Sequence, residues 1–154
     1  MMGQSPRDQI ALLDEEFARL HLQACELVGT VNEEAQTALP VGSLRKEVLR
    51  GAAVVEQTFG GITANLWDDP FEWTLPETLN TPELLVEYLN EVEATRQRAF
   101  ASLVSDEALG RDIVVPSGQR QTLQSLFRET ITRAAAFQSR AVEIRERAAS
   151  ESKS

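Results

Sequence analysis

The sequence predicts an all-α protein, an antiparallel four-helix bundle with a long aromatic loop between its second and third helices. Two observations lead to this fold class. Four stretches of roughly 17 to 27 residues repeat apolar side chains every three or four positions, the period of a helix with one buried face. Each stretch is polar on its other side, and four such helices bury their apolar faces most simply against one another.

The composition fits one domain. The chain has 154 residues, of which 42% are hydrophobic and 25% charged, which is ordinary for a globular protein with its own core. We expect the domain over residues 6–148 and a frayed polar tail over residues 149–154. A formal net charge of -9 disfavours nucleic acid as a partner, because phosphate attracts clusters of Lys and Arg. Without a signal-like or membrane-spanning segment, the sequence favours a cytoplasmic location and no membrane partner.

The first helix is expected from about residue 6 to residue 29. Gly29 is a natural place for it to end. The acidic residues 14–16 lie opposite the apolar stripe and indicate a solvated face. The steps between the stripe residues alternate between three and four. The stripe consists of Ile10, Leu13, Phe17, Leu20, Ala24 and Leu27.

The second helix is expected to begin at Ser43, which suits an N-cap, and to end at the pair Gly60-Gly61. Gly51 lies inside this helix, where glycine costs about 1 kcal/mol relative to alanine. This position therefore indicates a close approach of another helix or of a ligand. The apolar stripe consists of Leu44, Val48, Ala52, Val55 and Phe59.

The aromatic loop covers residues 62–80 and is the longest irregular stretch. It contains Trp67, Phe71 and Trp73 together with two prolines. Aromatic side chains in such number normally fold back over another part of the protein. The simplest reading is a lid that seals one end of the core, and the alternative is a pocket wall or a dimer contact.

The third helix has the clearest start, because Thr81 can cap it and Pro82 suits its first position. It is expected to end near residues 102–105. Residues 111–118 then read as an extended connection with a Pro-Ser-Gly turn. The apolar stripe of this helix consists of Leu85, Tyr88, Val92, Thr95 and Ala99.

The fourth helix is expected from about Thr122 to about Ala148. It is the longest of the four, and its mixed-sign C-terminal charges are typical of an exposed helix end. Its stripe consists of Leu123, Phe127, Ile131, Ala134, Phe137, Ala141 and Ile144.

Residues 43–49 read Ser-Leu-Arg-Lys-Glu-Val-Leu, and residues 116–127 contain a turn followed by Thr-Leu. With the helix that starts at Thr81, these stretches resemble the DinB-like (DinB/YfiT) superfamily over about residues 8–147. The resemblance implies a four-helix bundle and frequent homodimerisation. In many members it also implies a divalent metal held by three histidines, one on the second helix and two spaced four apart on the last.

This chain departs from the family pattern at each of those positions. The matching residues are Arg-Gly-Ala over 50–52 on the second helix, and Arg133 and Phe137 on the last helix. Arginine is cationic and phenylalanine has no donor atom, so neither replaces a histidine ligand. We therefore assign no metal ligand, no cofactor and no catalytic residue, and the family's metal-dependent activity is not carried over.

Five polar or aromatic side chains remain as a candidate pocket. His21 has two interpretations. One is a ligand or proton carrier at the border of the bundle interior, and the more common one is a histidine at the surface or core margin without such a role. With Cys25 one turn later it has the spacing to bind a metal or activate a thiolate, and a bystander cysteine is the more frequent case. The candidate pocket consists of His21, Glu56, Trp67, Glu129 and Arg133.

The two carboxylates of this set suit acid–base chemistry or a hard cation if they converge. Glu129 with Arg133 is more simply a surface ion pair at i,i+4. If that pair points inward, Arg133 makes the pocket favourable for an anion. A small-ligand pocket lined by Trp67, Trp73 and Arg133 is a further option.

The sequence thus predicts a metal-free, non-catalytic DinB-like protein that acts as a homodimeric binding or interaction module. A link to stress response is one option for its role. The alternative is a DinB-like enzyme, of the metal-dependent hydrolase or thiol transferase type, with a non-standard site. Such an enzyme requires His21, Cys25, Glu56 or Glu129 to meet at a cavity, and its assignment rests on analogy of fold.

Overall fold

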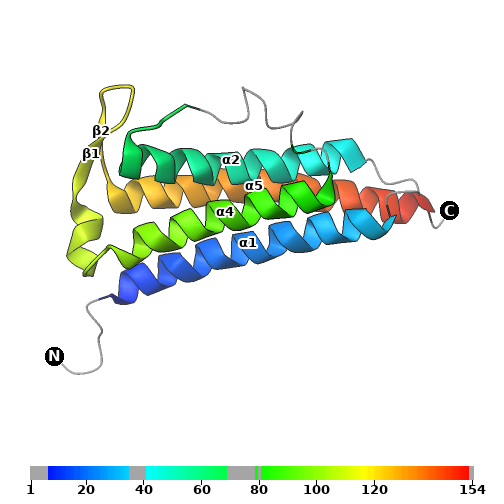
Figure 1. The fold of residues 1–154 in the computed structure, drawn as a ribbon, viewed down its shortest axis with the longest axis horizontal. Coiled ribbons are helices and arrows are strands. Elements are labelled where there is room, and N and C mark those ends of the chain that lie inside the picture. The colour runs from blue at the N-terminus through cyan, green and yellow to red at the C-terminus, as the bar shows by residue number, and fades with distance from the viewer. Residues whose placement is uncertain (1–6, 35–40, 69–78, 80, 153–154) are drawn as a thin grey trace.

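Four long helices form an elongated bundle in the computed structural model (Figure 1). The structure describes residues 7–34, 41–68, 79 and 81–152, and the side chains of 7–29, 44–68, 79 and 81–150. A short 3-10 helix and a two-stranded hairpin lie together at one end. The all-α prediction is confirmed. The elements are α1 (Asp8–Glu34), α2 (Val41–Ala64), α4 (Pro82–Ala101), η2 (Asp106–Gly110), β1 (Asp112–Val114), β2 (Arg120–Thr122) and α5 (Leu123–Ser152).

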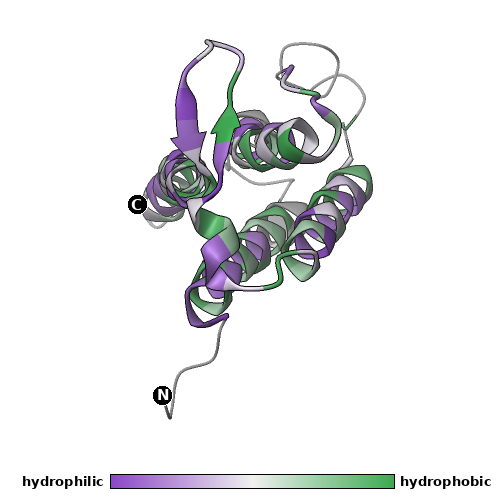
Figure 2. Cartoon of the chain, turned by 90° about the vertical axis from the view of Figure 1, so that its left-hand side faces the viewer, coloured by the Kyte–Doolittle hydropathy of each residue, from purple (hydrophilic) through white to green (hydrophobic). Residues whose placement is uncertain are grey.

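The helices run up, down, down and up. Around the bundle α1 neighbours α4, α4 neighbours α2, α2 neighbours α5 and α5 neighbours α1 (Figures 1 and 2). The pairs α1–α4 and α2–α5 are antiparallel, as expected, but α2–α4 and α1–α5 run parallel. The end of α2 and the start of α4 therefore lie at opposite ends, which explains why a long connection separates them.

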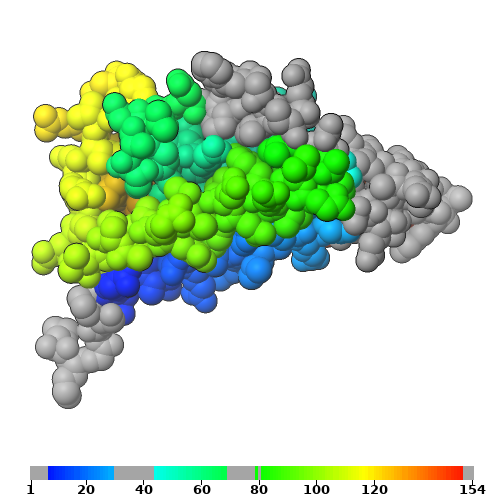
Figure 3. Space-filling model, in the orientation of Figure 1, coloured from blue at the N-terminus to red at the C-terminus, as the bar shows by residue number. Residues whose placement is uncertain are grey.

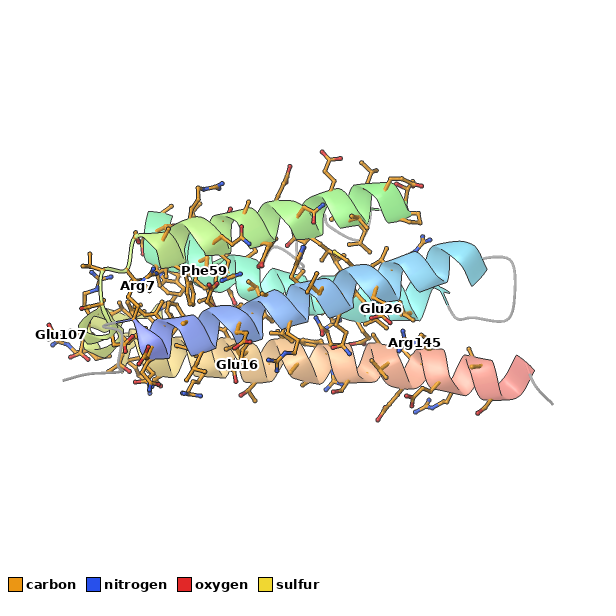
Figure 4. All side chains as sticks on the ribbon, turned by 90° about the horizontal axis from the view of Figure 1, so that it is seen from below. Arg7, Glu16, Glu26, Phe59, Glu107 and Arg145 are labelled. Atoms are coloured by element: carbon orange, nitrogen blue, oxygen red, sulfur yellow. The ribbon has the colours of Figure 1, made fainter. Side chains whose placement is uncertain are left out.

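The core has an aromatic half and an aliphatic half. Near the hairpin each helix contributes one phenylalanine, and the ring centroids lie 5.1 to 6.2 Å apart. Figure 4 shows Phe59 between the helices at this end. The other half is built mainly from leucines and valines, with two alanines and Tyr88, and there Arg145 of α5 approaches Glu26 of α1 to 3.7 Å. The four aromatic residues are Phe17, Phe59, Phe100 and Phe127.

Four predicted helix boundaries are wrong, and three of them are the end of α1, the start of α2 and the end of α5. Helix α1 continues past Gly29 to Glu34, and α2 begins at Val41, two residues before Ser43. Helix α5 continues to Ser152, so residues 149–152 of the expected polar tail are helical. Residues 153–154 of that tail, and residue 6 of the expected domain, lie outside the described residues. A glycine within a helix costs only about 1 kcal/mol relative to alanine, so Gly29 alone does not end α1.

The pair Gly60-Gly61 does not end α2 either, and the helix runs through it to Ala64. The chain then folds back onto the two glycines. A Cβ on Gly60 would lie 3.2 Å from the Leu66 carbonyl oxygen, and one on Gly61 would overlap the Trp67 ring. Asn65 makes the reversal in the left-handed region, with φ 57°, a conformation that asparagine tolerates.

Two backbone hydrogen bonds hold this reversal. The Asn65 amide donates to the Gly61 oxygen at 2.9 Å, and the Leu66 amide donates to the Gly60 oxygen at 3.0 Å. The start of the aromatic loop thus packs on α2. Residues 69–78, with Phe71 and Trp73, lie outside the described residues, so the lid reading stays a prediction.

Helix α4 begins as predicted. The Thr81 hydroxyl accepts a hydrogen bond from the Leu84 amide at 3.1 Å, and Pro82 is the first helical residue. The connection that follows is extended as predicted, but it forms a hairpin in which Ile113 lies opposite Gln121. Its turn contains Gly118 at φ 86°, where a side chain would be strained.

The short helix η2 caps the start of α1. Both oxygens of the Asp106 carboxylate accept backbone hydrogen bonds at 3.0 Å, from the amides of Gln9 and Ile10. These amides have no partner within their own helix, so the carboxylate supplies the acceptor that they need. Its negative charge also interacts favourably with the positive end of the helix dipole. The contact ties the start of α1 to the segment that follows α4.

Candidate binding site in the bundle interior

The five side chains predicted as a pocket do not meet at one place. Of the five, only His21 lines the cavity at the centre of the bundle. Its ring is half-buried on α1, on the side that faces α4. A site at the centre must therefore use residues that the sequence pattern did not single out.

Glu56 and Trp67 belong to separate local arrangements. The Glu56 carboxylate accepts a hydrogen bond from the Tyr88 hydroxyl at 2.6 Å, and both line a groove of about 170 Å³ between α2 and α4. Trp67 packs on Gly61, and its carbonyl oxygen accepts a hydrogen bond from the Gln57 side-chain Nε2 at 2.6 Å. Both residues serve contacts between neighbouring elements.

Glu129 and Arg133 lie exposed on α5. Glu129 accepts a hydrogen bond from the Gln121 side-chain amide at 2.8 Å. The side chains that the structure describes form no Glu129–Arg133 ion pair. Arg133 does not line the cavity at the bundle centre, and Trp73 lies outside the described residues.

The positions that the DinB-like resemblance assigns to metal ligands do not fit a metal. Gly51 of α2 lies directly against α5, where a Cβ would lie 3.3 Å from the Ala134 carbonyl oxygen and 3.6 Å from the Phe137 Cβ. Arg133 is exposed, and the Phe137 ring is covered by the Arg140 guanidinium at 5.2 Å from its centroid. The close approach expected at Gly51 is therefore a contact with another helix.

A metal site elsewhere would need several donor side chains close together. Within the ranges given above, no group of three or more His, Cys, Asp or Glu side chains is arranged to hold a metal ion. His21 and Cys25 on α1 are two such donors that lie close together.

The Cys25 sulfur lies 3.8 Å from Nε2 of His21. Burial, followed by the negative charge of Glu93, raises the pKa of the Cys25 thiol above its ordinary value. A nucleophilic cysteine requires the opposite shift, because the thiolate is the reactive form. The pair therefore lacks the electrostatic environment of an activated thiol.

A cavity of about 30 Å³ lies where all four helices meet. It is large enough for a water molecule or a group of similar size. Three polar side chains line it, namely His21, Glu93 and Gln138. The remaining walls are mainly apolar and include Phe17, Leu20, Ala24, Val55, Leu89 and Val92.

Gln138 has one satisfied and one unsatisfied polar atom. Its Nε2 donates to the Leu20 carbonyl oxygen at 2.7 Å, which fixes the orientation of the amide because only the nitrogen can donate. Its Oε1 is buried, and no donor in the described part of the chain reaches it. The side chain as a whole is 6% exposed, so this oxygen is an unsatisfied acceptor in the interior.

Glu93 is held by Arg96, which is fully buried. Arg96 Nε and Nη2 donate to the two Glu93 oxygens at 3.0 and 2.6 Å, and Nη1 donates to Asp14. The guanidinium also lies 5.6 and 5.1 Å from the ring centroids of Phe17 and Phe100. Burial acts to lower the pKa of Arg96, but its hydrogen bonds to the two carboxylates and their charges raise it, so the residue stays charged.

The sequence pattern missed this buried network. Asp14 was assigned to a solvated face, and its side chain is 53% exposed, but it pairs with Arg96. The buried stripe of α4 runs from Val92 through Arg96 to Phe100, where Thr95 and Ala99 were expected. The sequence did contain one indication of this burial, because Arg96 lies four residues from Val92 and four from Phe100, on the same helix face.

Comparisons with known proteins give no match, neither to a family model, nor to a curated protein, nor to a solved structure. The DinB-like resemblance thus rests on the sequence motifs and helix order described above. None of the helices in the described ranges combines the length and apolar character that crossing a membrane requires.

Proposed function

We propose that the chain is a metal-free, DinB-like bundle that works as a binding or interaction module, without catalytic activity. The observation that carries the proposal is the backbone contact between α2 and α5 at Gly51, with Arg133 and Phe137 at the other two ligand positions. A stress-response role and a cytoplasmic location belong to the same proposal.

The physical reason is the geometry that a metal requires. Three donor side chains must face one point from two helices, with an open position for water or substrate. A histidine at position 51 would need the space that the Ala134 backbone fills. The cationic Arg133 is exposed, and Phe137 has no donor atom. The family's site therefore cannot form without moving α2 away from α5.

Metal content and thermal unfolding test this proposal. The purified protein should carry far less than one equivalent of any divalent metal. Added Zn²⁺, Ni²⁺ or Mn²⁺ should leave the midpoint of thermal unfolding unchanged, because a ligand stabilises only the state that binds it. One equivalent of metal that raises the midpoint and is removed by a chelator would refute the proposal.

We also propose that the module is a homodimer, as the resemblance implies. Light scattering should then give a mass near twice that of the 17.1 kDa chain. The contact would be isologous, with the same patch used by both copies. A mass of one chain across the accessible concentration range would remove this part of the proposal and leave the metal-free binding module standing.

One observation favours the enzyme alternative, the contact between Cys25 and His21. Its test is the rate at which iodoacetamide alkylates Cys25 at pH 7. We expect alkylation slower than that of a free thiol, because the raised pKa keeps Cys25 protonated. Alkylation faster than that of a free thiol would favour the thiol transferase alternative.

A further inference from the structure

We propose that two copies of this chain associate through the outer face of α1, with their two α1 helices packed antiparallel. This contact surface deepens the proposed homodimer, on which the inference rests. Four exposed side chains of α1 form the surface, and they follow one another at steps of three, four and three residues. They are Leu12, Glu15, Arg19 and Leu22, which we call the α1 stripe.

The α1 stripe faces away from the bundle. Helix α1 runs along the lower edge of the molecule in Figure 3, and it lies between α4 and α5 in the view of Figure 4. Residues at these steps share one helical face. Leu12 is 55% exposed and Leu22 is 68% exposed. Single exposed leucines are common on protein surfaces, so the charges between them decide whether this face is a contact.

The α1 stripe is complementary to itself when two helices run in opposite directions. Leu12 and Leu22 are each five residues from position 17, and Glu15 and Arg19 are each two residues from it. A two-fold axis beside this position therefore brings Leu12 against the partner's Leu22, and Glu15 against the partner's Arg19. Each contact then occurs twice, as an isologous interface requires.

The charges of the α1 stripe select this arrangement. Neither Glu15 nor Arg19 forms an ion pair with any side chain that the structure describes. Two parallel helices in register would place each charge against its own kind. An antiparallel pair shifted by one heptad would place Arg19 against the partner's Leu22, or Leu12 against the partner's Glu15. The unshifted antiparallel pair matches leucine with leucine and opposite charges with each other.

Two like charges lie at the ends of the same face. The antiparallel pairing brings Asp8 opposite the partner's Glu26. Arg145 of α5 approaches Glu26 to 3.7 Å and offsets its charge. Both positions are nine residues from position 17, which is about 13.5 Å along the helix. Helices that cross at about 20° have begun to separate at that distance, so the repulsion at the ends is weakened.

Sedimentation equilibrium of the whole chain measures the dimer dissociation constant and tests the pairing by charge exchange. Glu15→Arg turns both contacts between Glu15 and the partner's Arg19 into repulsive pairs, and Arg19→Glu does the same. Each variant alone should dimerise about tenfold more weakly than the native chain, because like charges meet where ion pairs were. An equimolar mixture of the two variants should recover dimers. One chain then carries two positive charges in the α1 stripe, and the other carries two negative charges.

The leucines are tested by Leu12→Ser/Leu22→Ser, which removes the apolar contacts. It should weaken dimerisation about tenfold or more, because less apolar surface leaves water. Two variants at exposed positions of α4 are matched controls. Glu87→Arg makes the same charge change as Glu15→Arg, and Leu84→Ser removes a leucine that is 40% exposed. Both should dimerise as the native chain does.

Three results would overturn the inference. A native chain that stays monomeric at every concentration would remove the homodimer as well. A dimer that the α1 variants leave unchanged would reject this contact and leave the homodimer standing, and so would a mixture that dimerises no better than its two components. Circular dichroism confirms that each variant is folded. A stoichiometric metal on the protein would reject the metal-free proposal and has no bearing on this contact.

Discussion

Arg96 is a buried charged residue whose guanidinium donates hydrogen bonds to carboxylates of two helices. Glu93 binds two of its nitrogens from the same helix, and Asp14 binds the third from α1. A buried charge is tolerated only when its donors are satisfied. The network therefore links α1 to α4 at the boundary between the aromatic half of the core and the cavity.

Arg96→Met should be strongly destabilising. It leaves the buried Glu93 carboxylate without its partner, and breaking a buried pair from one side costs about 3–5 kcal/mol. Urea unfolding measures the loss. The double variant Arg96→Met/Glu93→Leu should recover most of it, because no unpaired charge remains. Arg98→Met, at an exposed position of the same helix, should change the free energy of unfolding by less than about 0.5 kcal/mol.

Cys25 should make stability depend on pH in the alkaline range. Its pKa is raised in the folded state, so the unfolded chain loses the thiol proton first as pH rises. The thiol's contribution to stability is complete below the pKa of the unfolded thiol, about 8.5. It is lost as pH rises from there toward the folded pKa.

Urea unfolding between pH 7 and pH 10 measures this effect as the difference between the native chain and Cys25→Ser. The native chain should lose more stability over this interval than the variant. If the free energy of unfolding changed equally with pH in the two proteins, the thiol would have the same pKa in the folded and unfolded chain, and the prediction would be wrong.

At the scale of the element, three glycines within helices have three different roles. A Cβ added to Gly29 would meet no atom of the described residues within 4 Å, whereas Gly51 touches the α5 backbone and Gly61 receives the Trp67 ring. Sequence alone marks all three as helix breakers or close contacts. Their roles differ because the neighbouring elements differ.

Gly29→Ala should stabilise the protein by about 0.5–1 kcal/mol, because alanine is the better helix former and no described residue stands in its way. Gly51→Val should destabilise it by about 1–3 kcal/mol, since the larger side chain forces α2 away from α5. Thermal or urea unfolding measures both. A loss of stability in Gly29→Ala would mean that α1 ends at this glycine.

Asp106→Ala should weaken the start of α1. The carboxylate accepts the amides of Gln9 and Ile10, and losing such a cap costs about 0.5–2 kcal/mol. Amide hydrogen exchange in the first turn of α1 should also become faster. Glu107→Ala changes an exposed carboxylate in the same short helix and should have little effect on either measurement.

At the scale of the whole molecule, the four helices and most of the core could be predicted from the sequence. The spacing of apolar residues located them because a helix buries one face, and the Thr81–Pro82 start was correct because capping is local. The ends at Gly29 and Gly60 were wrong, since a glycine costs a helix only about 1 kcal/mol and the chain folds back onto Gly60 and Gly61 only after α2 has reached Ala64. The hairpin was only partly predicted, because pairing depends on partners distant in the chain.

The candidate pocket was harder to predict because it depends on how helices are rotated and ordered. His21 reaches the cavity, but Glu129 and Arg133 face away from it. Gln138 on α5 and Glu93 on α4 line the cavity, and neither belonged to a distinguishing motif. Only the up–down–down–up order, which periodicity does not encode, brings them to the same cavity.

The contact between α2 and α5 is the feature on which the metal-free account depends most directly. X-ray diffraction from crystals grown with Zn²⁺, with anomalous data at the zinc edge, examines the contact and the metal together. We expect Gly51 in contact with the Ala134 backbone and no anomalous peak between these helices. A peak there, with α2 displaced from α5 and protein ligands around the metal, would contradict the account.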